Sequence, residues 1–304
     1  MDEKSSLGGK DMHWKDGLLL LLAATIYGGI FPVNRLAAEA AWPPVGFAFL
    51  QSILAGVILL VVLFLRGDRL PLAGYSLMTY LIIGGLVVGL PIGILVSAAE
   101  HLDASVITLV LCLSPILTLV IGSIAGLERF DRTILLGMLL GTAGIAVIAI
   151  PDTGVIAADA VGWFLLALVA PVMFASANNC AKWLRPQGAT SVAMAAGTLL
   201  GAGAVSLVVV LARGAAFLPA FLDFASLLPL AVATSINAAF FWLFFLIVER
   251  VGPARFSLFN YLAVAAGILW SLVVFGEQPA SLFWIALLLM VAGMYVALSR
   301  TSRG

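Results

Sequence analysis

Long apolar runs without charged residues recur along the whole chain. Of its 304 residues, 63% are hydrophobic and only 10% are charged. Such a composition is too apolar for a water-soluble protein, whereas about 20 apolar residues in a helix span the hydrocarbon core of a bilayer. The pattern predicts an all-α membrane protein with ten transmembrane helices, over residues 15–36, 44–65, 75–98, 103–125, 132–150, 159–184, 190–212, 225–248, 254–275 and 281–299.

The distribution of Lys and Arg predicts the orientation of these helices. With the N-terminus in the cytoplasm, thirteen of the 15 basic residues fall in segments on the inner side. The two others, Arg35 and Arg213, fall on the outer side. Because basic residues collect in cytoplasmic loops, both chain ends are expected in the cytoplasm, with the chain crossing the membrane many times.

A stretch of about fifty residues occurs twice. Residues 100–150 and 249–299 align without a gap, each as a polar turn, an apolar run, a turn with a Glu (Glu128 or Glu277) and a second apolar run. A repeat of this length indicates a duplicated fold. We therefore expect one five-helix repeat over residues 1–150, after a short cytosolic tail, and another over residues 151–304.

The predicted repeats have opposite orientations in the membrane, because five is an odd number of crossings. Inverted repeats are typical of secondary transporters, whose substrate site lies near the middle of the bilayer between the repeats. Duplication and orientation together therefore predict a transporter.

Prolines divide the predicted helices into two groups. A proline inside a helix removes a backbone donor and permits a kink. Helices 1, 3, 4, 6 and 8 contain one, and helix 9 is the repeat partner of helix 4. We expect these six helices to surround the pathway, with helices 2, 5, 7 and 10 as a scaffold. The predicted hinges are Pro32, Pro91, Pro115 and Pro171.

Polar and aromatic side chains within apolar runs are the candidates for contact with a substrate. Polar groups are costly in a bilayer, and aromatic rings offer stacking surfaces. The alternative for each is a packing contact or a hydrogen bond between helices. The candidates are Tyr27, Tyr80, Thr108, Phe174, Asn178, Asn179, Asn237, Trp242, Ser257, Asn260 and Tyr261.

Two cations occupy matching places in the first helix of each half. Tyr27 to Arg35 aligns with Phe174 to Lys182. Arg35 and Lys182 could extend to the membrane surface, as long basic side chains commonly do, or act as gate charges at the two mouths. Glu128 and Glu277 lie in turns, where we expect capping or packing contacts.

Several kinds of chemistry lack support in the sequence. No Asp or Glu lies in the middle of a predicted helix, and no central Lys or Arg is present to hold a phosphate. Enzyme motifs, metal-ligand clusters and nucleic-acid-binding stretches are missing, so we expect no enzyme activity, no cofactor, no metal and no nucleic-acid partner. Cys112 and Cys180 are expected to be small packing residues. The substrate is expected to be neutral or zwitterionic.

The repeated segments resemble the EamA-type drug/metabolite transporter superfamily. The matching pieces are SVITLVLCLSPILTLVIGSIAGLE and GMLLGTAGIAVI within residues 105–148, and RFSLFNYLAVAAGILWSLVVFGE and ALLLMVAGMYVAL within residues 255–298. Within it the chain is most similar to YddG-type exporters of aromatic and other neutral amino acids. The resemblance implies a bacterial protein of the inner membrane and amino-acid export, with some drug-like compounds as further substrates. The second copy departs from the first by carrying Val264 in place of Pro115.

The residues and the resemblance together predict export of neutral amino acids, especially aromatic or hydrophobic ones, by alternating access in a monomer. Without a central carboxylate, facilitated diffusion is favoured over proton coupling. The alternatives are export of drugs or other neutral metabolites, with or without proton coupling, and a channel or structural subunit. Leu111-Cys112 in one copy is Asn260-Tyr261 in the other, so specificity is expected mainly in the second copy.

Overall fold

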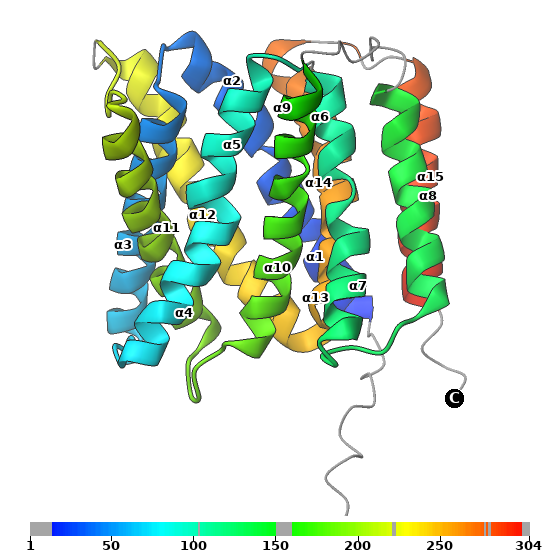
Figure 1. Cartoon of the computed structure of the whole chain (residues 1–304), viewed down its shortest axis with the longest axis horizontal. Helices are drawn as coiled ribbons and strands as arrows, with labels where there is room; N and C mark the ends of the chain where they lie inside the picture. Colours follow the sequence, from blue (N-terminus) through cyan, green and yellow to red (C-terminus); the bar gives the residue numbers. More distant parts are fainter. Residues whose placement is uncertain are drawn as a thin grey trace, which may run out of the picture.

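The computed structural model describes residues 14–102, 104–149, 160–220, 223–276, 278 and 281–299, and all its regular elements there are helical (Figure 1). They fall within or around the ten predicted segments. In chain order they are α1 (Trp14–Gly28), α2 (Ile30–Glu39), α3 (Pro44–Leu65), α4 (Gly74–Gly84), the π-helical η1 (Gly85–Gly89), α5 (Leu90–Ala99), α6 (Ala104–Leu111), α7 (Ser114–Ile124), α8 (Arg132–Ala149), α9 (Val161–Ala167), α10 (Val169–Trp183), α11 (Ser191–Arg213), α12 (Phe224–Val251), α13 (Pro253–Ser257), α14 (Phe259–Phe275) and α15 (Ser281–Ser299).

Seven helical segments of the described chain are long and apolar enough to cross a membrane, counting α1–α2, α4–α5, α9–α10 and α13–α14 as one segment each. Three shorter apolar helices lie in the predicted segments that remain: Ser114–Ile124, Arg132–Val147 and Ser281–Ala297. Length and composition alone therefore support a membrane protein with many helical crossings.

Four of the five helix interruptions precede a proline. Gly29 and Leu168 each lie three residues before Pro32 and Pro171, and Cys112 and Leu113 lie just before Pro115. The π-helical turn ends two residues before Pro91. Proline lacks an N–H group, and its ring clashes with a carbonyl of the preceding turn, which explains these positions. By contrast, α12 continues through Pro229.

The fifth interruption separates α13 from α14 at Leu258 and has a different cause. The hydroxyl of Ser257 donates to the carbonyl oxygen of Ala254 at 2.7 Å. The N–H groups of Leu258 and Tyr261 bond to carbonyl oxygens three residues earlier, at Arg255 and Leu258. A side chain that bonds back to the helix backbone bends the helix, and these tighter bonds complete the break.

The helices pack in pairs that follow the repeat. When each helix is replaced by its counterpart in the other half of the chain, the same set of pairs results. The second predicted segment (α3) packs with the seventh (α11), and the fifth (α8) with the tenth (α15). The first and ninth pack through α1 and α14, and correspondingly the sixth and fourth pack through α10 and α7. The two halves therefore interleave in one bundle instead of forming separate bodies.

Contacts between helix termini define two ends of the bundle. Asp16 near the start of α1 lies 3.8 Å from Arg250 near the end of α12, and Arg185 after α10 pairs with Glu249 at 2.9 Å. We call this the N-terminal end. At the far end, Arg213 of α11 donates to the carbonyl oxygen of Gly93 in α5 at 3.0 Å. α10 and α12 thus end where α1 begins, whereas α11 ends at the far end.

Glycines permit the closest of these contacts. A Cβ atom on Gly137 of α8 would lie 2.4 Å from the carbonyl oxygen of Gly293 in α15. A Cβ on Gly201 of α11 would lie 2.3 Å from the carbonyl oxygen of Tyr80 in α4. Small residues let helix backbones approach. These glycine faces are therefore covered by neighbours within the chain.

Candidate substrate cavity

A partly open cavity with a volume of about 360 Å³ lies inside the bundle. Binding sites for small molecules fall in a range of roughly 300–1,000 Å³. The wall includes residues at the junctions of α1 with α2, α6 with α7 and α13 with α14. The lining residues are Tyr27, Ile30, Phe31, Asn34, Gln51, Ser52, Val87, Val88, Ile92, Leu95, Thr108, Leu111, Cys112, Ser114, Ile145, Phe174, Asn178, Asn237, Phe240, Phe241, Phe244, Phe256, Phe259, Asn260, Tyr261, Ala263 and Val264.

The expected division into pathway and scaffold helices needs one correction. The six helices expected around the pathway all contribute lining residues, but α3, expected in the scaffold, contributes Gln51 and Ser52. α8 contributes Ile145. α3 has no proline beyond its first residue, Pro44, but its first half still faces the cavity.

One polar wall of the cavity is built by α3 and α12. The Asn237 side-chain nitrogen Nδ2 donates to Gln51 Oε1 at 2.8 Å and to the carbonyl oxygen of Ala233 at 3.0 Å. Both hydrogens on that nitrogen are therefore used within the protein. Gln51 Nε2 and Asn237 Oδ1 remain as a donor and an acceptor beside the cavity.

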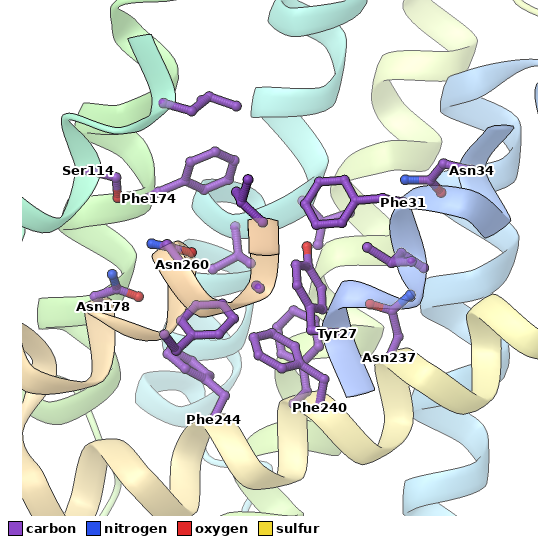
Figure 2. Close-up of a pocket in the computed structure, with 18 of the residues that line it drawn as sticks. Tyr27, Phe31, Asn34, Ser114, Phe174, Asn178, Asn237, Phe240, Phe244 and Asn260 are labelled. Atoms are coloured by element: carbon purple, nitrogen blue, oxygen red, sulfur yellow. The ribbon is translucent and has the colours of Figure 1, made fainter. Parts of the chain in front are cut away.

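A second polar wall combines Ser114, Asn178 and Asn260, which lie on one side of the cavity with Phe174, away from Asn34 and Asn237 (Figure 2). Asn178 Nδ2 donates to the hydroxyl of Thr118 at 3.2 Å, and Thr118 donates to the carbonyl oxygen of Ser114 at 2.8 Å. The buried Ser114 hydroxyl has no hydrogen-bond partner in the structure. This wall therefore has unused hydrogen-bonding capacity.

Aromatic rings line the cavity on the side where α12 ends and α13 begins, which is the side of the N-terminal end of the bundle. The Phe240 ring lies 4.2 Å from Tyr27 and 5.0 Å from Phe259, between ring centres. Phe256 lies 4.7 Å from both Phe259 and Phe244. Figure 2 shows Phe240 and Phe244 below Phe174 and Asn260, with Tyr27 beside Phe240. We call these five rings the aromatic floor; they offer a large stacking surface.

Seven of the residues expected to contact substrate line this cavity. They come from different helices and from both halves of the chain: Tyr27, Thr108, Phe174, Asn178, Asn237, Asn260 and Tyr261. Tyr261 also has a packing role, since its hydroxyl donates to the carbonyl oxygen of Met138 at 3.0 Å and bonds to the Thr142 hydroxyl. None of the lining residues, all within the described part of the chain, carries a formal charge.

The structure places the four other candidates away from the cavity lining. Tyr80 is buried against Gly197 of α11. Asn179 Nδ2 donates to the carbonyl oxygens of Thr118 and Ala175, both at 3.0 Å. Ser257 is fully buried at the break between α13 and α14.

The fourth, Trp242, is 36% exposed on the outside of the bundle, with the Arg66 guanidinium 5.6 Å from its ring centre. Each of these four side chains therefore has a packing or surface environment. Their apolar context in the sequence is the same as that of the lining residues.

The predicted gate cations occupy opposite ends of the bundle. Arg35 pairs with Glu39 at 3.1 Å at the far end, and its guanidinium lies 4.2 Å from the centre of the Phe275 ring. Lys182 donates to the carbonyl oxygen of Leu127 at 3.3 Å at the N-terminal end. Glu277, which the sequence pairs with Glu128, lies outside the described residues.

Sequence reasoning missed several lining residues. Gln51 and Ser52 are the only polar residues of the segment 44–65, and that signal could have identified them. Asn34 was not selected as a candidate because the charge of its neighbour Arg35 was the more prominent feature. Nothing in the sequence distinguishes the phenylalanines of the aromatic floor from other phenylalanines, because this residue is common on surfaces that face lipid.

Comparisons with known proteins agree on the kind of molecule. The model of the EamA-like transporter family matches this chain twice, over residues 15–150 and 161–299. The uncharacterized inner membrane transporter YedA of Escherichia coli (strain K12) is 26% identical over 268 residues, which cover 86% of this chain and 83% of YedA. YedA of Escherichia coli O157:H7 matches to the same extent.

A solved structure described only as "Crystal structure of protein" shares the fold. Its TM-score is 0.77 at 20% sequence identity, and the match covers 93% of this chain and 98% of that one. This likeness concerns the fold alone. With the family model matching both halves of the sequence, the chain belongs to the EamA-like transporter family.

Proposed function

We propose that this membrane transporter exports neutral amino acids, especially aromatic and hydrophobic ones, by alternating access. The observation that carries the proposal is the cavity itself: amide and hydroxyl groups on two walls, an aromatic floor and no formal charge. Amides and hydroxyls can hydrogen-bond both a carboxylate and an ammonium group. The aromatic floor suits an apolar or aromatic side chain.

The proposed topology consists of ten crossings in two inverted repeats, with the N-terminal end of the bundle in the cytoplasm. The exchange symmetry of the helix pairs and the two family matches support it. The bias of Lys and Arg toward the N-terminal end supports the orientation. The relatives named above are inner membrane transporters, which supports the same location here. The substrate cavity then lies between the repeats, where alternating access requires it.

The described conformation suits the outward-facing state of this cycle. Lining residues such as Asn34, Leu95 and Thr108 extend toward the far end, while the aromatic floor lies toward the N-terminal end. Export also requires a second state in which the N-terminal end opens to load substrate.

Purified protein in liposomes tests the proposal. Labelled phenylalanine and threonine loaded inside should exchange with external amino acid, and phenylpropionate and phenethylamine, which each lack one head-group charge, should compete poorly. No movement of any neutral amino acid, with correctly folded protein, would reject it. Since no charged side chain lines the cavity, transport without an imposed ion gradient is expected, and a strict requirement for a pH gradient would contradict that part.

The second candidate is export of drugs or other neutral metabolites. It is favoured by the predominance of apolar side chains in the lining. A growth assay with a panel of toxic compounds, in cells that overproduce the protein, separates it from amino-acid export.

A further inference from the structure

Glu128 lies in the turn between α7 and α8 and contacts the start of α13. Its Oε2 atom accepts a hydrogen bond from the N–H group of Ala254 at 3.2 Å. Its other oxygen lies against Gly252, where a Cβ atom would collide with it. Gly252 has φ of +87°, a backbone conformation that also favours glycine. The carboxyl group thus fits into a notch that depends on this glycine.

Lys182 joins α10 to the same contact. Its ammonium group donates to the carbonyl oxygen of Leu127, the residue before Glu128, at 3.3 Å. Its positive charge and that of Arg255 in α13 both favour the charged form of Glu128. Three segments therefore meet here: the turn after α7, the end of α10 and the start of α13.

These three segments also carry parts of the cavity wall. Ser114 of α7, Asn178 of α10 and Phe256 of α13 are lining residues. If the segments separated at the N-terminal end, the second polar wall would open toward that end. Their contact therefore lies between the second polar wall and the N-terminal end of the bundle.

The surroundings of Glu128 do not fully compensate its negative charge. Burial raises the pKa of the Glu128 carboxyl above its usual value of 4.5, and this effect exceeds the opposing effects of Lys182, the Ala254 N–H group and Arg255. Removal from water penalises the charged form. When the N-terminal end opens, the same carboxyl would return to water and lose that penalty.

We propose that Glu128 is a proton-sensitive latch, which holds the N-terminal end of the cavity closed and releases more easily when it is ionised. The proposal rests on the alternating-access function proposed above. The notch at Gly252 and the Ala254 hydrogen bond hold the carboxyl group in either protonation state. A proton removes the cost of burying a charge and so strengthens the closed form.

The direction of the pH effect follows from linkage. The pKa of Glu128 is higher in the closed form than in an open form where the carboxyl is hydrated, so the closed form binds the proton more strongly. The stabilisation of the closed form by this proton is complete below the pKa of the hydrated carboxyl. It is lost as the pH rises through the higher pKa that Glu128 has in the closed form. Lys182 and Arg255 are the charged groups that act on Glu128.

Two substitutions at Glu128 test the latch with opposite expected results. Glu128→Gln keeps the size and an acceptor for Ala254 but cannot ionise, so it should populate the closed form more than the natural protein at pH 7.5. Glu128→Ala removes the acceptor and leaves the notch empty, so it should populate the open form. Each pKa unit of difference between the two forms corresponds to about a tenfold change in their ratio.

The measurement is the distance between spin labels at the N-terminal end of the full-length protein in liposomes. Cysteines introduced at the exposed positions Gln187 and Arg132 carry the labels, with Cys112 and Cys180 replaced by serine. The matched control is Glu249→Gln, which removes a carboxylate at the same end whose partner is Arg185. It should leave the distance distribution unchanged.

Shifts of the same sign in Glu128→Gln and Glu128→Ala, or no shift in either variant, would overturn the latch. The measurement needs no substrate, so it stands even if liposome assays show that the protein carries something other than amino acids. Conversely, amino-acid transport without a second distance population would reject the latch and leave the substrate assignment intact.

Discussion

At the scale of single residues, the hydrogen bond between Gln51 and Asn237 is the contact that most directly shapes the first polar wall. It joins residues 186 positions apart, and the amide groups it orders face the cavity. Leaving one member of a buried polar pair unmatched costs about 1–3 kcal/mol. On the proposed function, substrate recognition at this wall is therefore expected to depend on both side chains.

Gln51→Leu should weaken substrate binding, because it removes a donor from the cavity and leaves Asn237 Nδ2 without its 2.8 Å partner. We expect the concentration for half-maximal exchange to rise about 5- to 150-fold, in line with that penalty. Concentration-dependent exchange in liposomes measures it. Trp242→Phe, on the outside of the bundle, is the control, and an equal loss there would indicate general damage.

Asn260 and Cys112 occupy nearly corresponding places in the two copies, and both line the cavity. Asn260→Leu removes an amide from the second polar wall, whereas Cys112→Ser alters a thiol that already donates to the carbonyl oxygen of Thr108 at 3.0 Å. We expect the first substitution to change the order of preferred substrates and the second to change it little. Competition with a panel of amino acids measures this, and equal effects would contradict a specificity concentrated in the second copy.

Asn178 and Asn179 show why sequence could nominate residues without assigning their roles. They are adjacent and equally polar, but only Asn178 lines the cavity, while Asn179 bonds to backbone of α7 and α10. Successive helical residues point about 100° apart, so the rotation of α10 against its neighbours decides between them. That rotation is set by packing and cannot be read from α10 alone.

At the scale of helices, the proline-associated breaks were predictable because their cause is local. The break between α13 and α14 was not predicted from proline, because it depends on the Ser257 hydrogen bond and the tighter turn around Leu258. Proline chemistry therefore located the hinge candidates in the other interrupted segments.

Pro171→Ala should make α9 and α10 continuous, because residue 171 then gains an N–H group for the preceding turn. We expect the thermal midpoint to rise or stay the same while the transport rate falls severalfold, since the hinge stiffens. Melting curves in detergent and liposome exchange check both. Pro229→Ala in the continuous helix α12 should leave transport largely unchanged; a similar loss there would argue against a hinge at Leu168.

The α8–α15 contact offers a test of close packing. Gly137→Ala places a methyl group where the carbonyl oxygen of Gly293 lies, so the helices must separate. Overpacking of this kind costs about 1–3 kcal/mol. Denaturation in mild detergent should show this loss, whereas Gly162→Ala, with nothing within 4 Å of the added carbon, should show none. Unchanged stability of Gly137→Ala would contradict the contact.

At the scale of the whole molecule, the packing pairs join the two halves of the chain in one bundle. α3 with α11 and α8 with α15 join corresponding helices of the two halves, while α1 with α14 and α10 with α7 form the inner pairs. The cavity draws its walls from both halves, so relative movement of the inner pairs would change access to it. Under the proposed alternating access, the Glu128 contact at the N-terminal end would then affect the direction of access.

Acidification should shift the whole bundle toward closure of the N-terminal end. Burial raises the pKa of Glu128 in the closed form, so lowering the pH from neutral toward the ordinary carboxyl value of 4.5 stabilises that form. The short-distance population between labels at positions 132 and 187 should grow as pH falls, and Glu128→Gln should abolish this dependence. A pH response that persists in Glu128→Gln would assign it to another group.

Local chemistry let the sequence by itself determine the apolar helical segments, the proline-linked breaks and the bias of basic residues toward one end. The repeat in the sequence also predicts a duplicated fold. Only the tertiary structure decided which polar side chains meet, because these contacts join helices far apart in sequence: Gln51 with Asn237, and Glu128 with Ala254, 126 positions away. In a uniformly apolar chain, helix rotation and neighbour choice depend on side-chain packing summed over many helices, which no single segment encodes.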